Sequence, residues 1–160
     1  MAFDAAKEYL EKIGLGDRVK EFDVSSATVE LAAQAVGCEP AHIAKTLSFL
    51  LGDECILIVA AGDAKVDNPR YKTRFGTKAK MIPADQVEEL IGHGVGGVCP
   101  FGTKPGVTVY LDESLRRFEV VYPAAGTPAS AVELNLAELE QASGASGWVD
   151  VCKGWRPEQS

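Results

Sequence analysis

The chain has 160 residues, of which 46% are hydrophobic and 24% charged, a globular balance that excludes an intrinsically disordered protein. Its 16 basic and 23 acidic side chains give a net charge of −7, which argues against a protein that holds a polyanion over a broad surface. The longest apolar run, residues 55–61, is too short for a membrane helix, and the start of the chain lacks the pattern of a secretory signal. We therefore expect a cytoplasmic protein without a membrane partner, with one domain over residues 1–155 and a flexible tail over residues 156–160.

The first half of the chain alternates helical and strand-like segments. Patterning predicts, in order, a helix over residues 2–13, a strand over 19–24, a helix over 28–36, a short helix over 41–44, and strands over 46–51 and 55–61. Ser25 or Ser26 is the expected cap of the second helix, and Gly37 its end. The two apolar strands are separated by a short polar turn and should form an antiparallel hairpin at the centre of the sheet.

The second half of the chain continues the mixture. Patterning predicts, in order, a helix over residues 68–75, a short strand over 80–82, a helix over 83–91, strands over 107–111, 118–122 and 130–134, a helix over 136–142 and a last strand over 148–152. Asp112 is the expected cap of a turn that follows its strand. The order of elements indicates an α+β, or mixed α/β, fold with a central, largely antiparallel mixed sheet surrounded by helices.

Residues 92–106 form a glycine-rich segment between a helix and a strand. Glycines allow the backbone to approach a ligand closely and to turn its N–H groups towards an oxyanion or a phosphate. The segment has neither the Walker pattern nor the setting of a dinucleotide fingerprint. A plain glycine-rich connection is the alternative interpretation.

Lys45 lies at a junction where most neighbouring residues are expected in the core. A cation in such a place can hold a carbonyl or phosphate oxygen in a cleft. The alternative is a lysine whose aliphatic stem is buried and whose ammonium reaches solvent.

The cysteines and histidines indicate neither a metal site nor a cofactor. His42 and His93 have no second ligand at metal-like spacing. Cys99 lies in the glycine-rich segment and is a candidate nucleophile with either histidine as its base, although a small buried residue is the more ordinary interpretation. The four cysteines form no CxxC pair and are expected to be reduced thiols: Cys38, Cys55, Cys99 and Cys152.

One stretch of the acidic chain is locally basic. It is either a solvated face or the place where phosphates bind, and its cations are Lys65, Arg70, Lys72, Arg74, Lys78 and Lys80.

Four short motifs, taken in their order and spacing, resemble the YbaK/EbsC family of aminoacyl-tRNA deacylases, which is related to the editing (insertion) domain of prolyl-tRNA synthetase. The likeness covers almost the whole chain, and the motifs are Ala44-Lys45-Thr46, Gly96-Gly97-Val98-Cys99-Pro100-Phe101-Gly102, Val109-Tyr110-Leu111-Asp112 and Ala125-Gly126. The resemblance implies a trans-acting hydrolase that cleaves small amino acids from mischarged tRNA. It also implies the acceptor end of an aminoacyl-tRNA as the partner, a synthetase as a second candidate partner, and no DNA.

The resemblance assigns roles to residues of this chain. Lys45 matches a lysine that orients the 3′-terminal nucleotide through its phosphate. The loop of residues 96–100 matches one whose available backbone N–H groups would stabilise the oxyanion while water attacks the ester. The implied catalytic residues are Lys45, Gly96, Gly97, Val98, Cys99 and Pro100. The implied substrate-binding residues are Thr46, Leu47, Ile58, Phe101, Gly102 and Asp112. Two alternatives stay open: a catalytically silent binding module of the same fold, and a cysteine hydrolase that uses Cys99.

Overall fold

A six-stranded sheet with the strand order β8-β6-β2-β3-β5-β9 forms the centre of the molecule. The computed structural model describes residues 2–22, 28–93, 98–126 and 130–155. The strands of this sheet are β2 (Ile43–Leu51), β3 (Glu54–Ala61), β5 (Val107–Asp112), β6 (Val120–Pro123), β8 (Leu134–Asn135) and β9 (Gly147–Val149).

The predicted mixed sheet and its central hairpin are confirmed. β2 and β3 pair antiparallel in a register that places Leu47 opposite Ile58. The six-stranded sheet is less antiparallel than expected, because β2–β6, β3–β5 and β5–β9 are parallel, whereas β2–β3 and β6–β8 are antiparallel. Parallel neighbours require long return connections, and the connections between these strands carry most of the helices.

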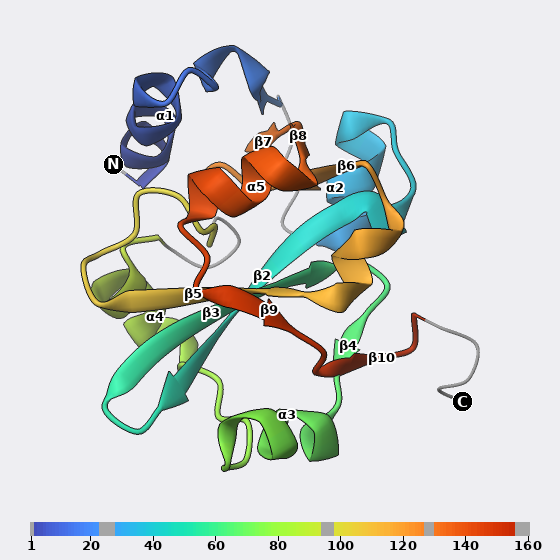
Figure 1. Cartoon of the computed structure of the whole chain (residues 1–160). Helices are drawn as coiled ribbons and strands as arrows, with labels where there is room; N and C mark the ends of the chain where they lie inside the picture. Colours follow the sequence, from blue (N-terminus) through green and yellow to red (C-terminus); the bar gives the residue numbers. More distant parts are fainter. Residues whose placement is uncertain (1, 23–27, 94–97, 127–129, 156–160) are drawn as a thin grey trace.

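Helices lie on both sides of the sheet, with α1 and α5 above it and α3 below it in the view of Figure 1. The helices are α1 (Ala2–Lys12), α2 (Val29–Val36), α3 (Asn68–Phe75), α4 (Ala84–Ile91) and α5 (Leu136–Ser143), with 3-10 turns η1 (Gly16–Arg18), η2 (Pro40–His42) and η3 (Glu113–Arg117). The hydroxyl of Tyr9 joins α1 to α5 by donating to the carbonyl of Ala142 at 2.5 Å. Thr28 caps α2 through its side chain, whereas the expected caps Ser25 and Ser26 lie outside the described residues.

Two small antiparallel sheets flank the central one. β1 (Val19–Glu21) pairs with β7 (Ser130–Val132), and β4 (Lys65–Val66) pairs with β10 (Cys152–Lys153). The predicted strand over residues 130–134 is therefore divided between β7 and β8, and the one over 148–152 between β9 and β10. The predicted strand over 80–82 is a single bridge between Met81 and Phe49.

The junction before Lys45 differs from the expectation. A helix was expected over residues 41–44, but η2 ends at His42 and β2 begins at Ile43, so that Lys45 lies inside a strand. Ladder pairing explains the difference, because Ala44 is paired with Ala61 on one side and with Pro123 on the other.

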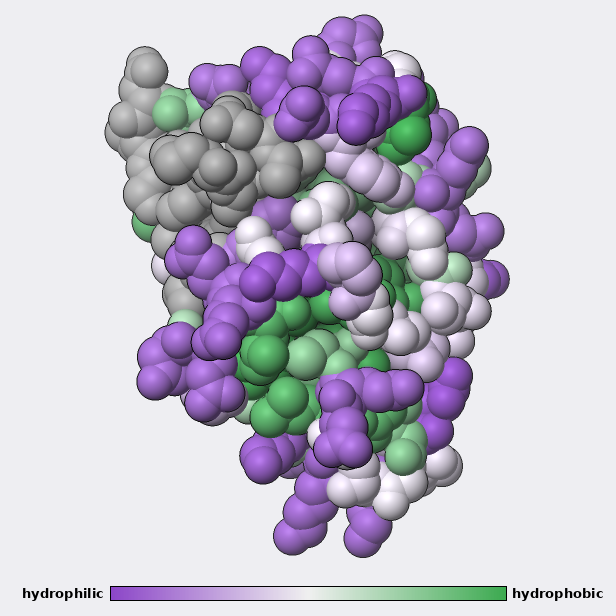
Figure 2. Space-filling view, turned by 90° about the vertical axis from the view of Figure 1, so that its left-hand side faces the viewer, coloured by the Kyte–Doolittle hydropathy of each residue, from purple (hydrophilic) through white to green (hydrophobic). Residues whose placement is uncertain are grey.

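The hydrophobic core surrounds β3, whose residues 56–61 are all fully buried. A strand with neighbours on both edges and helices over both faces loses all contact with water, which accounts for its unbroken apolar sequence. Figure 2 shows a hydrophobic area ringed by hydrophilic side chains on the face to the left in Figure 1.

None of the helices in the described part of the chain is long and apolar enough to cross a membrane. The expected tail over residues 156–160 lies outside the described residues.

Candidate functional site

A cavity of about 410 Å³ lies beside an edge of β2. β6 pairs with this edge at Ile43 and Ala44, and Met81 pairs with it at Phe49. Between them, residues 45–47 pair with β3 on the opposite edge but with no described strand on this one. The volume falls in the range of roughly 300–1,000 Å³ that is typical of small-molecule sites. The unpaired edge of β2 at residues 45–47 therefore forms one wall of a candidate binding site.

Small and apolar side chains from several elements form the other walls. α2, α4, β6 and β7 each contribute, and the apolar lining residues include Val29, Ala32, Ile82, Val87, Val98 and Ala131. Among the few polar groups is Thr46, whose Oγ1 is buried and has no hydrogen-bond partner among the described residues. A mostly apolar pocket with few polar groups is the usual composition of a site for a small organic ligand.

Lys45 is half-buried in the wall of this cavity. Its Nζ donates to the carbonyl oxygen of Ala64 and lies 3.5 Å from that of Gly62. Burial lowers the pKa of the ammonium below its ordinary value, and the carboxylate of Asp63 is among the groups that act against this shift. An ammonium has three N–H donors, and within the described part of the chain only these two carbonyls accept from it, which leaves one donor for an anionic or carbonyl ligand.

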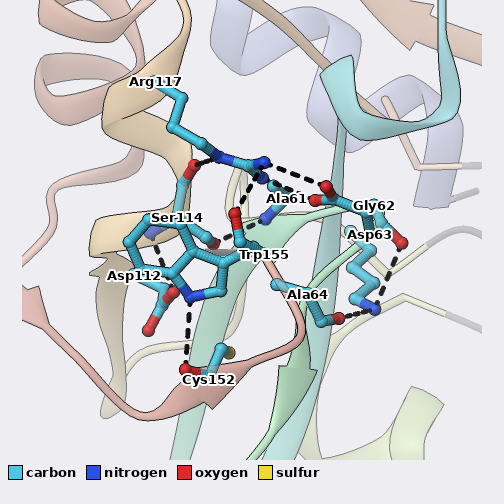
Figure 3. Close-up of polar contacts among 10 residues, drawn as sticks. Ala61, Gly62, Asp63, Ala64, Asp112, Ser114, Arg117, Cys152 and Trp155 are labelled. Carbon is cyan, nitrogen blue, oxygen red and sulfur yellow. Dashed lines mark hydrogen bonds and ion pairs between the residues drawn. The ribbon is translucent and has the colours of Figure 1, made fainter. Parts of the chain in front are cut away.

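The turn that holds Lys45 is itself held by η3, as Figure 3 shows. Asp63 lies between the two accepting carbonyls, and Arg117 binds its carboxylate with both terminal nitrogens, at 2.9 and 2.5 Å. The hydrogen bond from Arg117 is the largest cause that lowers the pKa of Asp63. Ser114 accepts the N–H of Ala61 at 3.1 Å, so that η3 contacts both the residue before the turn and Asp63 in its middle.

The described part of the glycine-rich segment reaches the same cavity through Val98. Pro100 and Phe101 are buried, and Gly102 is half-buried with a φ of 62° that favours glycine. Gly96 and Gly97 lie outside the described residues.

Cys99, within this segment, carries a fully buried thiol. Its Sγ lies 3.5 Å from Nε2 of His93, and the same nitrogen lies 2.6 Å from the carbonyl oxygen of Phe101. Burial raises the pKa of Cys99 to about 12 and lowers that of His93. A thiol that is protonated and inaccessible to solvent is a poor nucleophile, which argues against a cysteine hydrolase. His42 lies elsewhere, with its ring centroid 4.1 Å from that of Phe118.

Four of the six residues expected to bind the substrate do not line the cavity: Ile58, Phe101, Gly102 and Asp112. Ile58 is fully buried in β3. Asp112 is also fully buried, and its carboxylate accepts the N–H groups of Ser114 at 2.9 Å and Val151 at 3.0 Å. The structure brings together Lys45, Thr46, Leu47 and Val98 from the expected set.

Sequence reasoning did not identify the turn that holds Lys45 or its partner Arg117. The turn has a weak signal in the residues Gly62 and Asp63 at the end of an apolar strand. Arg117 has none, because its contact with Asp63 joins residues 54 positions apart.

The basic stretch borders a second hollow of about 460 Å³, lined by Asn68, Pro69, Lys72, Lys78 and Ala79. Arg70 is partly neutralised by Asp67 and Asp150.

Among the described residues, no group of three or more histidine, cysteine, aspartate or glutamate side chains could hold a metal ion.

Comparisons with known proteins identify sequence relatives of this chain. Residues 23–142 match the aminoacyl-tRNA editing domain. The chain is 47% identical over 156 residues to the uncharacterized protein YwhH of Bacillus subtilis (strain 168), covering 97% of this chain and 99% of that protein. It is 25% identical over 114 residues to a proline–tRNA ligase of Lysinibacillus sphaericus (strain C3-41), covering 71% of this chain but only 19% of the ligase.

A solved structure points the same way. A protein named as a candidate trans-editing enzyme for prolyl-tRNA synthetase superposes with a TM-score of 0.86 at 31% identity, covering 96% of this chain and 98% of that one. The sequence match, the shared fold and the lysine in an apolar cavity lead to one conclusion: the chain belongs to the aminoacyl-tRNA editing domain family.

Proposed function

We propose that the protein is a trans-acting aminoacyl-tRNA deacylase, which hydrolyses the ester bond of tRNA charged with a wrong, small amino acid. The observation that carries this proposal is the ammonium of Lys45, held by two carbonyls in the wall of an apolar cavity with a donor to spare. The family match and the candidate trans-editing relative support it. Charged tRNA is a cytoplasmic substrate, and we propose that location for the protein.

In this proposal Lys45 binds a phosphate or carbonyl oxygen at the 3′ end of the substrate. The backbone N–H groups of residues 96–99 stabilise the negative charge that develops on the ester carbonyl, a contribution that is often large in acyl transfer. Water is the nucleophile, aligned by the 2′-hydroxyl of the terminal adenosine. Val98 lines the same cavity as Lys45, which supports the proposal.

The substrate side chain would lie against the apolar walls, next to Leu47 and Val98. Apolar walls distinguish one methylene group by only about 1–3 kcal/mol, so several small amino acids can be accepted. The unpartnered hydroxyl of Thr46 would favour an amino acid or an ester group that offers it a hydrogen bond.

The remainder of the tRNA is bound weakly in this proposal, because the chain carries a net charge of −7. Phosphates of the acceptor end would lie near Lys72 and Lys78, which border the second hollow. Tight binding of uncharged tRNA at physiological salt, with a steep dependence on salt, would contradict this part of the proposal.

The deciding experiment measures release of labelled alanine, cysteine, serine, threonine and proline from the corresponding aminoacyl-tRNAs. Wild type should hydrolyse one or two of them, Lys45→Ala should lose this activity, and Lys12→Ala, at the exposed end of α1, should keep it. If wild type releases nothing above the uncatalysed rate, the protein is a silent binding module of the same fold. Dependence on an added synthetase would identify that enzyme as a partner.

A further inference from the structure

The position of the Lys45 ammonium is set by a three-residue turn. Its two acceptors, the carbonyls of Gly62 and Ala64, lie on either side of Asp63, directly after the end of β3. A carbonyl oxygen moves whenever the backbone dihedrals of its turn change. The backbone conformation around Asp63 therefore determines the position of the Lys45 ammonium.

Arg117, at the end of η3, is the side chain that binds this turn. Its two terminal nitrogens bind the two oxygens of Asp63, at 2.9 and 2.5 Å, which is the fork geometry that arginine forms with a carboxylate (Figure 3). Its Nε donates to the carbonyl of Ser114 at 2.9 Å, and Nη1 also lies 3.3 Å from the carbonyl oxygen of Trp155. The guanidinium is thus held by its own helix and by the C-terminal segment while it holds the turn.

Aromatic rings limit the freedom of this guanidinium further. Its central carbon lies 4.7 Å from the ring centroid of Phe118 and 5.2 Å from that of Trp155. The indole of Trp155 is anchored in turn, because its Nε1 donates to the carbonyl of Cys152 at 3.2 Å. A chain of contacts therefore runs from the C-terminal segment through Arg117 and Asp63 to the carbonyls that hold Lys45.

We propose that Arg117 is a positioning residue of the Lys45 site, which acts on the reaction by holding Asp63 and, through it, the carbonyls of Gly62 and Ala64. The inference rests on the proposed function for its effect on turnover. It does not require Arg117 to touch the substrate.

If the ion pair served only to stabilise the fold, its loss would lower the free energy of unfolding and would affect turnover only through unfolding. The Arg117 and Asp63 side chains are 27% and 37% exposed, and ion pairs with this exposure contribute little to the stability of a fold. Loss of the pair should leave folding nearly unchanged. A large loss of turnover in a stable variant would then come from a displaced ammonium.

The first test compares Arg117→Gln with Arg116→Gln. Arg116 is the neighbouring residue of η3, and its guanidinium lies over Trp148 and near Glu113, away from the turn. We expect kcat/KM for ester hydrolysis to fall roughly tenfold to a hundredfold in Arg117→Gln, the range that a small misplacement of a reacting group can cause. The control variant should keep wild-type kinetics, and both variants should unfold close to the urea midpoint of wild type.

A double-mutant cycle separates positioning from a general defect. If Arg117 acts through Lys45, Arg117→Gln should cause no further loss in the residual activity of Lys45→Ala. An equal loss in both backgrounds would overturn the proposal.

A second measurement does not depend on turnover. NMR titration of the lysine side chains, with the Lys45 signal assigned by its absence from Lys45→Ala, reports the pKa of the ammonium. We expect this pKa to rise in Arg117→Gln, because the freed Asp63 carboxylate can then turn towards the ammonium, and to stay at the wild-type value in Arg116→Gln. The other groups that act on the Lys45 charge, and that both variants leave in place, are Cys152, Lys65 and Glu30.

The hydrolysis assay and the Lys45 titration distinguish failure of the proposed function from failure of the positioning role. If wild type hydrolyses no aminoacyl-tRNA, the proposed function fails, and the titration still decides whether Arg117 controls Lys45. An unchanged Lys45 titration in Arg117→Gln overturns the positioning role, whatever the protein hydrolyses.

Discussion

Asp112 is the residue at which a structural role can best be separated from the substrate-binding role that the family resemblance implies. Its buried carboxylate accepts the N–H of Ser114 with one oxygen and the N–H of Val151 with the other. In Asp112→Asn one of these oxygens becomes an NH₂ group, which faces an N–H donor and cannot accept from it. Leaving a buried donor unsatisfied costs about 1–3 kcal/mol, so we expect the free energy of unfolding to fall by about 2 kcal/mol.

Urea unfolding followed by circular dichroism measures this change, with Asp53→Asn as the control. Asp53 is exposed in the turn between β2 and β3, and its substitution should leave the urea midpoint unchanged. Ester hydrolysis by Asp112→Asn should proceed with the kcat of wild type under conditions in which the variant is folded. A variant that is as stable as wild type but no longer hydrolyses the ester would refute this reasoning and place Asp112 at the substrate.

Three further predictions follow from buried or closely packed groups. Cys99→Ala should keep the kcat of ester hydrolysis, because a thiol whose pKa is raised to about 12 is not the nucleophile; loss of all turnover would contradict this. Gly62→Ala should lower the free energy of unfolding by about 1–3 kcal/mol in urea titrations, since its Cβ would lie 2.0 Å from a backbone oxygen of η2, whereas Gly147→Ala, with no atom within 4 Å, should not. Because Arg117 lowers the pKa of Asp63, their pair should stabilise the fold above about pH 4, the unfolded value, and stop doing so as pH falls through the lower folded pKa. The pair is partly exposed, so this contribution is at most about 1 kcal/mol, and melting temperatures from pH 2 to 6 should fall only slightly less steeply in Asp63→Asn than in wild type.

Local patterns were sufficient for most of the secondary structure. The apolar spacing of α4 and the paired apolar runs of β2 and β3 correspond to elements close to the predicted bounds. These signals are local, because side chains three or four residues apart share a helix face and a short polar turn joins two strands. The sequence missed β4, since two residues that pair with the far end of the chain carry no pattern of their own.

The candidate site was predictable only in part. Lys45 attracted attention because an ammonium among core residues requires a partner, and Val98 because it belongs to a glycine-rich segment. Cys99 and Asp112 carry groups that are often catalytic, and sequence alone could not distinguish a reactive thiol or carboxylate from one that is buried and bound to backbone groups. That distinction depends on burial and on partners distant in sequence.

The sequence by itself determined the class of fold, its family and the lysine at the centre of the candidate site, because these depend on residue types and on their spacing along the chain. Tertiary structure decided which of those residues share a cavity, and it showed that Arg117 and Asp63 hold the turn beneath the Lys45 ammonium. The physical reason is that this cavity lies at the edge of β2 that β6 covers only at its start, and its walls come from α2, α4, β6 and β7, which are distant in sequence. The turn that binds Lys45 likewise depends on η3 and the C-terminal segment packing together. Contacts between residues so far apart in sequence leave no periodic signal to read in advance.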